Sequence, residues 1–158
     1  MPSATLLGEF DPQAFLKRYW QKSPCLIRSA IPALISPISP EELAGLACEA
    51  EVEARIVQKM RRKPGWSVRH APFTEQDFTS LPARDWTLLV QDVDKYVPEL
   101  ARLLDRFRFV PNWRVDDLMV SYATDGGGVG PHVDAYDVFL LQAQGFRRWS
   151  ISTETYAD

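Results

Sequence analysis

The sequence predicts an α+β fold in which helices come first and a run of short strands follows. Capped stretches with one apolar face at helical spacing occupy the first third of the chain. Short apolar segments separated by glycine-containing turns fill the last third. This order is typical of an α+β arrangement, and closely spaced short strands are typical of a barrel or a sandwich. The 158 residues match about one average domain in length.

Two helices are predicted near the N-terminus. The first begins at the cap Asp11 with Pro12 in its first turn and ends near Pro24. The second runs over residues 40–50, because Ser39 and Glu42 have the spacing of a capping box. The apolar faces are Phe15, Leu16, Tyr19 and Trp20 in the first helix and Leu43, Leu46 and Ala47 in the second.

Strands and one more helix follow. Residues 25–27 are apolar and predict a short strand, and residues 51–56 alternate in the period of a half-buried strand. Basic residues 59–63 predict an exposed hairpin tip, with a phosphate contact as the alternative. The remaining predicted elements are a strand over 86–91, a helix over 97–107, and strands over 118–122, 137–142 and 147–151.

The composition excludes several classes of protein. The formal net charge of −3 argues against a general DNA-coating protein, and direct DNA binding is not expected. No apolar run approaches the roughly 18 residues that span a membrane, and no basic stretch leads into an apolar signal core. A cytoplasmic protein is therefore expected. Cys25 and Cys48 have no paired spacing, which favours reduced thiols that serve in packing.

The segment over residues 126–137 carries the chemistry. Its glycines and Pro131 shape a loop that delivers His132 and Asp134. Residues two apart in extended backbone point to the same side, so the imidazole and the carboxylate converge. Two histidines and one carboxylate bind Fe(II) in a facial triad that leaves three positions open, and this pair supplies two of those ligands. The alternative is a surface histidine at a glycine turn.

Arg147 is the second candidate. In a strand over 147–151 it shares one face with Trp149 and Ile151. A guanidinium directed toward a barrel interior needs an anion, which a dicarboxylic cosubstrate would supply through paired hydrogen bonds. An internal salt bridge to Asp134, Asp137 or another carboxylate, or an arginine at the end of the strand that reaches solvent, is the alternative.

The string DDLMVSYATDGGGVGPHVDAYDVFLLQAQGFRRWSI, together with WQKSPCLIRSAI, ISPEELAGLACEAEVEARIV and WTLLVQDVDKYVPELARLL upstream, closely resembles the bacterial ribosomal oxygenases of the JmjC class. The resemblance covers nearly the whole chain. It implies a double-stranded β-helix, a jelly-roll of the cupin and JmjC kind, with iron(II) as the metal and 2-oxoglutarate as the cosubstrate. It also implies hydroxylation of an arginine side chain in a large-subunit ribosomal protein.

The resemblance assigns roles to the matching residues. His132 and Asp134 are implied as the first two iron ligands, and Arg147 as the residue that binds the distal carboxylate of 2-oxoglutarate. Tyr136 shares the strand parity of the ligands and either lines the substrate pocket or packs as a buried structural residue. Asp116 and Asp117 either recognise a substrate guanidinium or are solvated.

One departure from the family pattern is large. The family's third ligand is a histidine on a later barrel strand, and no histidine follows His132 here. His70 precedes the core strands, and a surface or packing histidine is favoured there over a replacement ligand. We therefore expect a truncated barrel that is inactive alone, with residues 1–110 as the N-terminal region and 111–158 as the first barrel strands. The later barrel strands, the dimerisation helices and the winged-helix region of a homodimeric parent are expected to be absent.

Two other functions remain open at this stage. One is a non-catalytic, cupin-like binding or scaffold module, which a chain lacking one ligand would resemble. The other is an oxygenase that hydroxylates a histidine of a ribosomal protein. Iron-dependent decarboxylation of 2-oxoglutarate distinguishes the first from an enzyme, and peptide hydroxylation distinguishes the second from an arginine hydroxylase.

Overall fold

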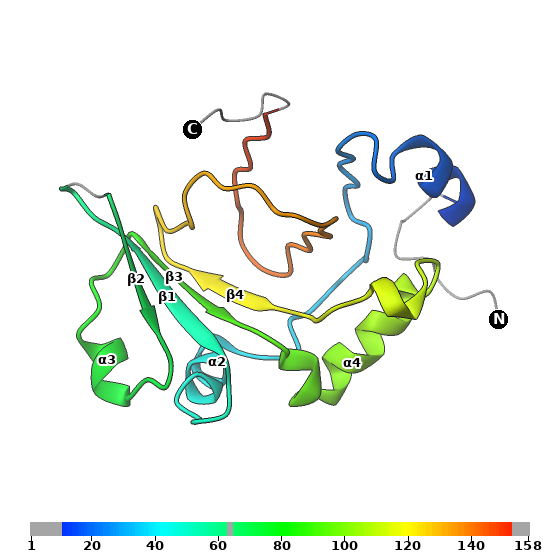
Figure 1. The fold of residues 1–158 in the computed structure, drawn as a ribbon. Helices are drawn as coiled ribbons and strands as arrows, with labels where there is room; N and C mark the ends of the chain where they lie inside the picture. Colours follow the sequence, from blue (N-terminus) through cyan, green and yellow to red (C-terminus); the bar gives the residue numbers. More distant parts are fainter. Residues whose placement is uncertain (1–10, 63–64, 153–158) are drawn as a thin grey trace.

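A computed structural model describes residues 11–62 and 65–152 (Figure 1). Short 3₁₀ turns over Val93–Lys95, Asp105–Phe107 and Asn112–Arg114 connect the later elements. The helices and strands in chain order are α1 (Pro12–Arg18), α2 (Pro40–Leu46), β1 (Ala54–Lys59), β2 (Trp66–His70), α3 (Glu75–Thr79), β3 (Trp86–Val90), α4 (Pro98–Leu104) and β4 (Val120–Ala123).

The predicted caps of the first two helices are confirmed. The Asp11 carboxylate accepts a hydrogen bond of 2.9 Å from the backbone N–H of Ala14. Ser39 and Glu42 form a complete capping box, with hydrogen bonds of 3.1 and 2.8 Å. Both helices end earlier than the sequence predicts. After α2, the N–H groups of residues 48 and 49 bond to carbonyls three residues back, so the chain tightens and leaves the helix.

Four antiparallel strands form a single sheet in the order β2-β1-β3-β4. The register gives the sheet two different faces, because residues directly opposite each other point the same way. One face, here called the helix face, contains Ala54, Ile56, Leu88, Val90 and Val120. The other, here called the loop face, contains Arg55, Val57, Trp66, Val68, His70, Thr87, Leu89, Ser121 and Ala123.

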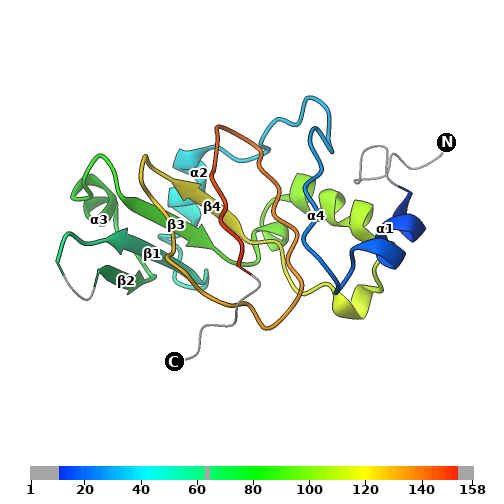
Figure 2. The ribbon, with the colours of Figure 1, turned by 90° about the horizontal axis from the view of Figure 1, so that it is seen from above.

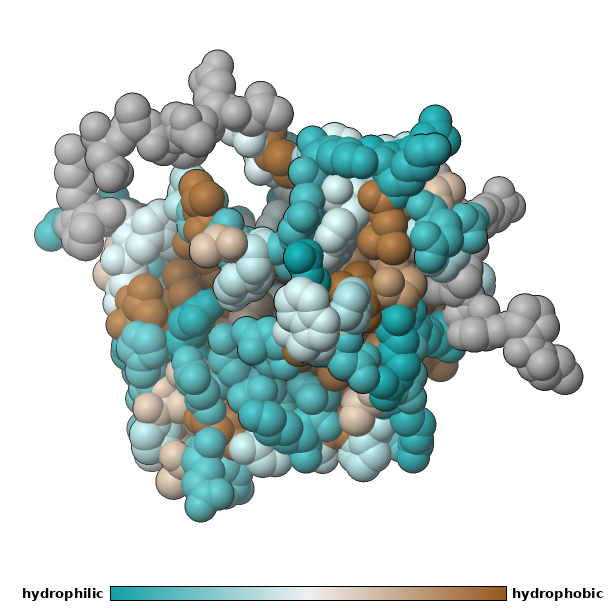
Figure 3. Space-filling model, turned by 45° about the vertical axis from the view of Figure 1, so that its right-hand side comes forward, coloured by the Kyte–Doolittle hydropathy of each residue, from teal (hydrophilic) through white to brown (hydrophobic). Residues whose placement is uncertain are grey.

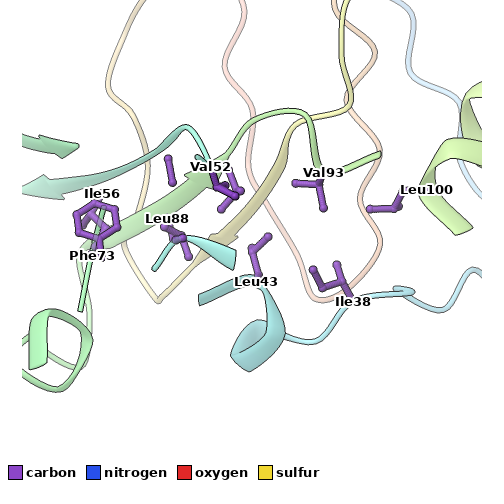
Figure 4. Close-up of a cluster of buried hydrophobic side chains, with 11 residues drawn as sticks. Ile38, Leu43, Val52, Ile56, Phe73, Leu88, Val93 and Leu100 are labelled. Atoms are coloured by element: carbon purple, nitrogen blue, oxygen red, sulfur yellow. The ribbon is translucent and has the colours of Figure 1, made fainter. Parts of the chain in front are cut away.

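The main core lies against the helix face. Leu43 of α2 and Val93 are almost completely buried with Ile56 and Leu88 (Figure 4). Phe73 closes the end of this cluster near α3, where its ring meets Phe78 edge to face. The alternation predicted over residues 51–56 is confirmed, since Val52, Ala54 and Ile56 all enter this core. Burial of these side chains is the main source of stability in the sheet.

The chain after β4 crosses the opposite side of the sheet. In Figures 1 and 2 the orange segment passes over the loop face, whereas α2 lies on the other side. A packing contact also places this segment on the loop face, because Gly130 lies against Trp66, whose side chain belongs to that face. The candidate motif is therefore held above a sheet whose other face carries the core.

Three predicted strands do not form. Residues 25–27, 137–142 and 147–151 have extended or irregular backbone without strand pairing in the structure. Their apolar pattern is right for strands, but a strand also needs a neighbour for its N–H and C=O groups. None of the described strands pairs with them, and Leu26 is 77% exposed. The predicted strands over 86–91 and 118–122 and the helix over 97–107 are confirmed within a few residues.

Two simpler expectations agree with the structure. Cys25 and Cys48 are free, and burial raises the pKa of the Cys48 thiol, with Asp77 and nearby glutamates contributing. Arg61 and Arg62 are exposed at the β1–β2 hairpin, as predicted for a hairpin tip over residues 59–63. Lys63, the last residue of that predicted tip, lies outside the described residues. In the described ranges, no helix is long and apolar enough to cross a membrane.

Asp77 gives a pH-dependent test of how α3 is held. Hydrogen bonds from the side chain and backbone of Thr74, assisted by Arg69 at 2.8 Å, lower the pKa of the Asp77 carboxyl. The stabilisation is therefore present above the ordinary carboxyl pKa of about 3.9 and is lost as the pH falls through the lowered value. Asp77→Asn should reduce the free energy of unfolding at neutral pH, and the difference from wild type should shrink in acid.

Chemical denaturation at a series of pH values checks this expectation. Glu75→Gln is the matched control, because Glu75 lies in the same helix and its carboxylate accepts no hydrogen bond from the described residues. A destabilisation by Asp77→Asn that is the same at every pH would contradict the role given to the carboxylate.

Candidate metal and cosubstrate site

The glycine loop starts from a turn that is tied to the beginning of β3. The backbone N–H of Trp86 donates to the Thr124 hydroxyl at 3.2 Å, and that hydroxyl donates to the Trp86 carbonyl at 3.1 Å. A β-carbon at Gly127 would collide with the same carbonyl, and one at Gly126 would collide with the Asp85 carboxylate. At Gly127 the obstacle is backbone, so only glycine permits this close approach of the loop to the sheet.

A second close approach follows three residues later. Gly130 has a φ of +77°, which disfavours any residue with a side chain. A methyl group added there would lie 3.0 Å from Cε2 and 3.1 Å from Nε1 of Trp66. The loop therefore rests on the indole ring of β2 immediately before it reaches the predicted ligands.

His132 and Asp134 converge as predicted. The imidazole Nε2 lies 3.5 Å from the Asp134 Oδ2, and the two side chains are 45% and 46% exposed. The other ring nitrogen, Nδ1, lies 3.0 Å from the carbonyl oxygen of Gly130. Because a carbonyl only accepts, Nδ1 donates a proton to it, and Nε2 is the ring nitrogen that faces the carboxylate. One nitrogen and one carboxylate oxygen are thus available to the same cation.

The downstream end of the motif is held by the helical half of the chain. The Gln21 amide donates to the Asp137 carboxylate at 3.0 Å. Two residues later, the Phe139 ring packs against Phe107 at a centroid distance of 4.9 Å and against Trp20 at 5.7 Å. We call this the aromatic cluster; its members are Phe15, Tyr19, Trp20, Phe107, Phe109 and Phe139.

Arg147 is half-buried and has no carboxylate partner among the described residues. Its guanidinium lies 5.8 Å from the centroid of the Trp149 ring, as expected if the two share one face of extended chain. The alternative of an internal salt bridge to Asp134 or Asp137 is not seen. Within residues 11–62 and 65–152, no carboxylate therefore competes with an anion for this guanidinium.

The other candidate residues are not gathered around His132. Tyr136 is 68% exposed, so it is not the buried structural tyrosine of the alternative interpretation. Asp116 is exposed, whereas the Asp117 carboxylate accepts a hydrogen bond of 3.2 Å from the backbone N–H of Asp92. That bond fixes the connection between β3 and the segment leading into β4.

The described residues supply two ligands and no third. No group of three histidine, cysteine or acidic side chains within them is arranged to hold a metal ion. His70 is an exposed residue of β2, as the surface interpretation predicts. A depression of about 410 Å³, lined in part by Glu42, Glu49 and Glu99, lies between α2 and the start of α4, and neither His132 nor Asp134 lines it.

Several residues that position the motif escape sequence reasoning. Trp66 lies in a hairpin strand about 65 residues before the motif, and Gln21 and Trp20 lie far upstream. No spacing rule joins residues so distant in sequence. The signals that were available are the run of glycines, which predicts close approaches, and the aromatic residues at 107, 109 and 139, which predict a packing cluster.

Comparisons with known proteins extend these observations. Residues 102–158 match the JmjC domain. The chain is 48% identical over 137 residues to the ribosomal protein uL16 3-hydroxylase of Escherichia coli K12, covering 87% of this chain and 36% of that protein. It is 44% identical over 140 residues to a probable ribosomal oxygenase of Haemophilus influenzae, covering 89% of this chain and 34% of that protein. The chain spans about a third of the length of these relatives.

The fold agrees with a solved structure as well. The ribosomal oxygenase YcfD from Escherichia coli, in complex with cobalt and 2-oxoglutarate, superimposes with a TM-score of 0.74 at 45% sequence identity. The match covers 80% of this chain and 34% of that one. The predicted resemblance to ribosomal oxygenases and the predicted α+β class with part of a JmjC barrel are confirmed.

The aromatic cluster generates a stability test. Phe139 is 36% exposed and contacts four other rings, whereas Phe146 is fully exposed. Replacement of a completely buried phenylalanine by alanine costs about 3–5 kcal/mol, so Phe139→Ala should cost about 1–3 kcal/mol. Phe146→Ala is the matched control and should change stability by no more than about 0.5 kcal/mol.

Urea denaturation of the two variants provides the measurement. Equal effects of the two substitutions would show that the cluster does not hold the motif segment.

Proposed function

We propose that this chain, whose residues 102–158 match the JmjC domain, is part of an iron(II)- and 2-oxoglutarate-dependent oxygenase that hydroxylates an arginine side chain of a large-subunit ribosomal protein. The observation that carries the proposal is the convergence of His132 Nε2 and Asp134 Oδ2, 3.5 Å apart at the end of the glycine loop. The pair lies inside the matched segment. Extended backbone alone brings the side chains of an HxD tripeptide to one side, so the proposal rests on this convergence together with the match of the segment and the support of the imidazole by the Gly130 carbonyl.

The donor set fits iron(II) as two ligands of a facial triad. A neutral imidazole nitrogen and a carboxylate oxygen are the ligand types that this ion takes in non-haem oxygenases. The Gly130 carbonyl holds the imidazole through Nδ1, which is the usual support for a ligating histidine. Bound iron(II) would supply the activation of dioxygen, while the chain orients the ligands around it.

Arg147 is the proposed contact for the cosubstrate. A half-buried guanidinium without a carboxylate partner among the described residues can form two parallel hydrogen bonds with the distal carboxylate of 2-oxoglutarate. The Trp149 ring on the same face would limit its movement. The solved relative that contains cobalt and 2-oxoglutarate supports the choice of this cosubstrate.

The substrate is proposed from the relatives and from the charge of the candidate residues. Two of the relatives are a hydroxylase of a ribosomal protein and a probable ribosomal oxygenase. A cationic arginine would be attracted to the exposed carboxylate of Asp116, and Tyr136 is exposed enough to contact a peptide. Asp117 would act indirectly, because its carboxylate already bonds to the backbone of Asp92.

The proposal extends to the organisation of the protein. Residues 1–110 would form the N-terminal region of the domain and residues 111–158 the start of its barrel, in a homodimer that works where ribosomal proteins are made, in the cytoplasm. Because the described residues contain only two ligands, the 158-residue chain by itself should not turn over 2-oxoglutarate. Decarboxylation by this chain alone would contradict that part of the proposal.

Removal of either ligand tests the metal site. In the full-length protein, His132→Ala or Asp134→Ala should abolish iron-dependent conversion of 2-oxoglutarate to succinate, because each removes one of the two ligands. His70→Ala is the matched control and should leave the rate unchanged, since His70 is exposed and lies outside the pair. Succinate formation is measured together with the mass of a ribosomal-protein peptide.

The two readouts separate the competing functions. Turnover that survives both ligand substitutions would exclude the metal assignment, and a +16 Da shift on histidine instead of arginine would exclude the arginine substrate. Absence of turnover in the wild-type protein would favour a binding module.

Arg147→Ala tests the cosubstrate contact separately. The variant should bind 2-oxoglutarate more weakly by about 1.5–3 kcal/mol, the usual contribution of a hydrogen bond to a charged group. Calorimetric titration measures the affinity, and Arg148→Ala serves as the control because the adjacent Arg148 is exposed whereas Arg147 is half-buried. An affinity that is equal in the two variants would remove Arg147 from the site.

A further inference from the structure

We propose that Trp66 is a positioning residue for His132 and that it acts through the backbone of Gly130. This inference rests on the proposed function, because it takes His132 as a metal ligand. It adds to the candidate metal site a residue of β2, an edge strand of the sheet that lies outside the segment matching the JmjC domain. The role follows from two consecutive contacts, one of packing and one of hydrogen bonding.

The first contact is between the indole and the loop. Trp66 is the first residue of β2 and pairs with Lys59, so its side chain lies on the loop face of the sheet. Gly130 approaches so closely that an added β-carbon would lie 3.0–3.3 Å from three atoms of the ring. The ring is planar and rigid, and it forms a floor on which the loop backbone rests.

The second contact joins Gly130 to the imidazole. The Gly130 carbonyl accepts the Nδ1 proton of His132 at 3.0 Å. Among the neutral forms of the imidazole, this bond favours the tautomer in which Nε2 has a free lone pair, and it fixes the plane of the ring so that Nε2 faces Asp134. The direction of the carbonyl therefore decides whether the histidine is ready to bind a metal.

The two contacts together explain why the indole ring is needed beneath Gly130. Gly130 has a positive φ and no side chain, so its peptide groups are less restricted than those of other residues. Without the indole, the peptide between Gly130 and Pro131 has room to tilt toward the sheet, and the carbonyl would turn away from Nδ1. The imidazole would then sample both tautomers and several rotamers, and only a fraction of them would bind a metal.

The test uses the full-length protein with cobalt(II) alone as the probe. Trp66→Ala removes the floor, Trp66→Phe keeps a smaller flat ring, and Trp113→Ala is the matched control because Trp113 is 80% exposed on another part of the chain. Calorimetric titration gives the cobalt affinity. Nitrogen-15 spectra of the histidines in the metal-free protein give the tautomer of His132, a readout that is independent of catalysis. Thermal unfolding is measured for every variant.

We expect Trp66→Ala to weaken cobalt binding by roughly tenfold or more, the usual loss when a group that orients a ligand is removed. Its metal-free spectrum should change from the Nδ1–H tautomer to an averaged signal. The cobalt affinity of Trp66→Phe should lie between those of Trp66→Ala and wild type. Trp113→Ala should match wild type in both the affinity and the spectrum. If Trp66→Ala does not fold, Trp66→Phe decides, and it should still lower the affinity.

Other outcomes overturn the inference. Wild-type affinity and tautomer in Trp66→Ala, or in Trp66→Phe where only that variant folds, would remove Trp66 from the site. An equal loss of affinity in Trp113→Ala would show a general effect on stability. His132→Ala separates this failure from failure of the proposed function: if that variant binds cobalt as tightly as wild type, His132 is not a ligand and both proposals fall.

Discussion

The close contact between the glycine loop and the sheet is the constraint on which the candidate site depends. The backbone lies close to the Asp85 carboxylate at Gly126, to the Trp86 carbonyl at Gly127 and to the Trp66 ring at Gly130. Each approach fixes the height of the loop above the sheet and therefore the place where His132 and Asp134 emerge. Glycine is required for space at Gly127, where the obstacle is backbone, and a positive φ favours it at Gly126 and Gly130.

The loop is held at its two ends by different kinds of interaction. At its start, hydrogen bonds between Thr124 and Trp86 continue the pairing of β3 with β4. At its end, the aromatic cluster connects Phe139 to α1 and to the segment after α4. Hydrogen bonds orient the backbone at the start of the loop, and ring packing stabilises its end. The segment between them therefore keeps a defined course, although its own backbone makes few regular hydrogen bonds.

The two faces of the sheet have different roles, because the helix face carries the main core and the loop face lies beneath the candidate site. The helix face is covered by α2 and by a continuous group of aliphatic side chains (Figure 4). On the loop face, Thr87 Oγ1 and Gln91 Oε1 are buried without a hydrogen-bond partner among the described residues. Apolar side chains also reach the molecular surface in several places (Figure 3), and Val133, Leu140 and Ile151 of the chain after β4 are more than half exposed. The side of the sheet that carries the motif is thus the less completely packed one.

The sequence by itself determined the features that depend on near neighbours. Helix caps at Asp11 and Ser39, the alternation over residues 51–56 and the convergence of His132 with Asp134 all arise within a few residues, where φ and ψ preferences and side-chain periodicity act. Only the tertiary structure decided which apolar segments became strands, because a strand needs a partner from elsewhere in the chain. It also decided that Trp66 supports Gly130 and that Phe139 joins Trp20, since packing contacts between residues so far apart in sequence follow from topology and have no local signal.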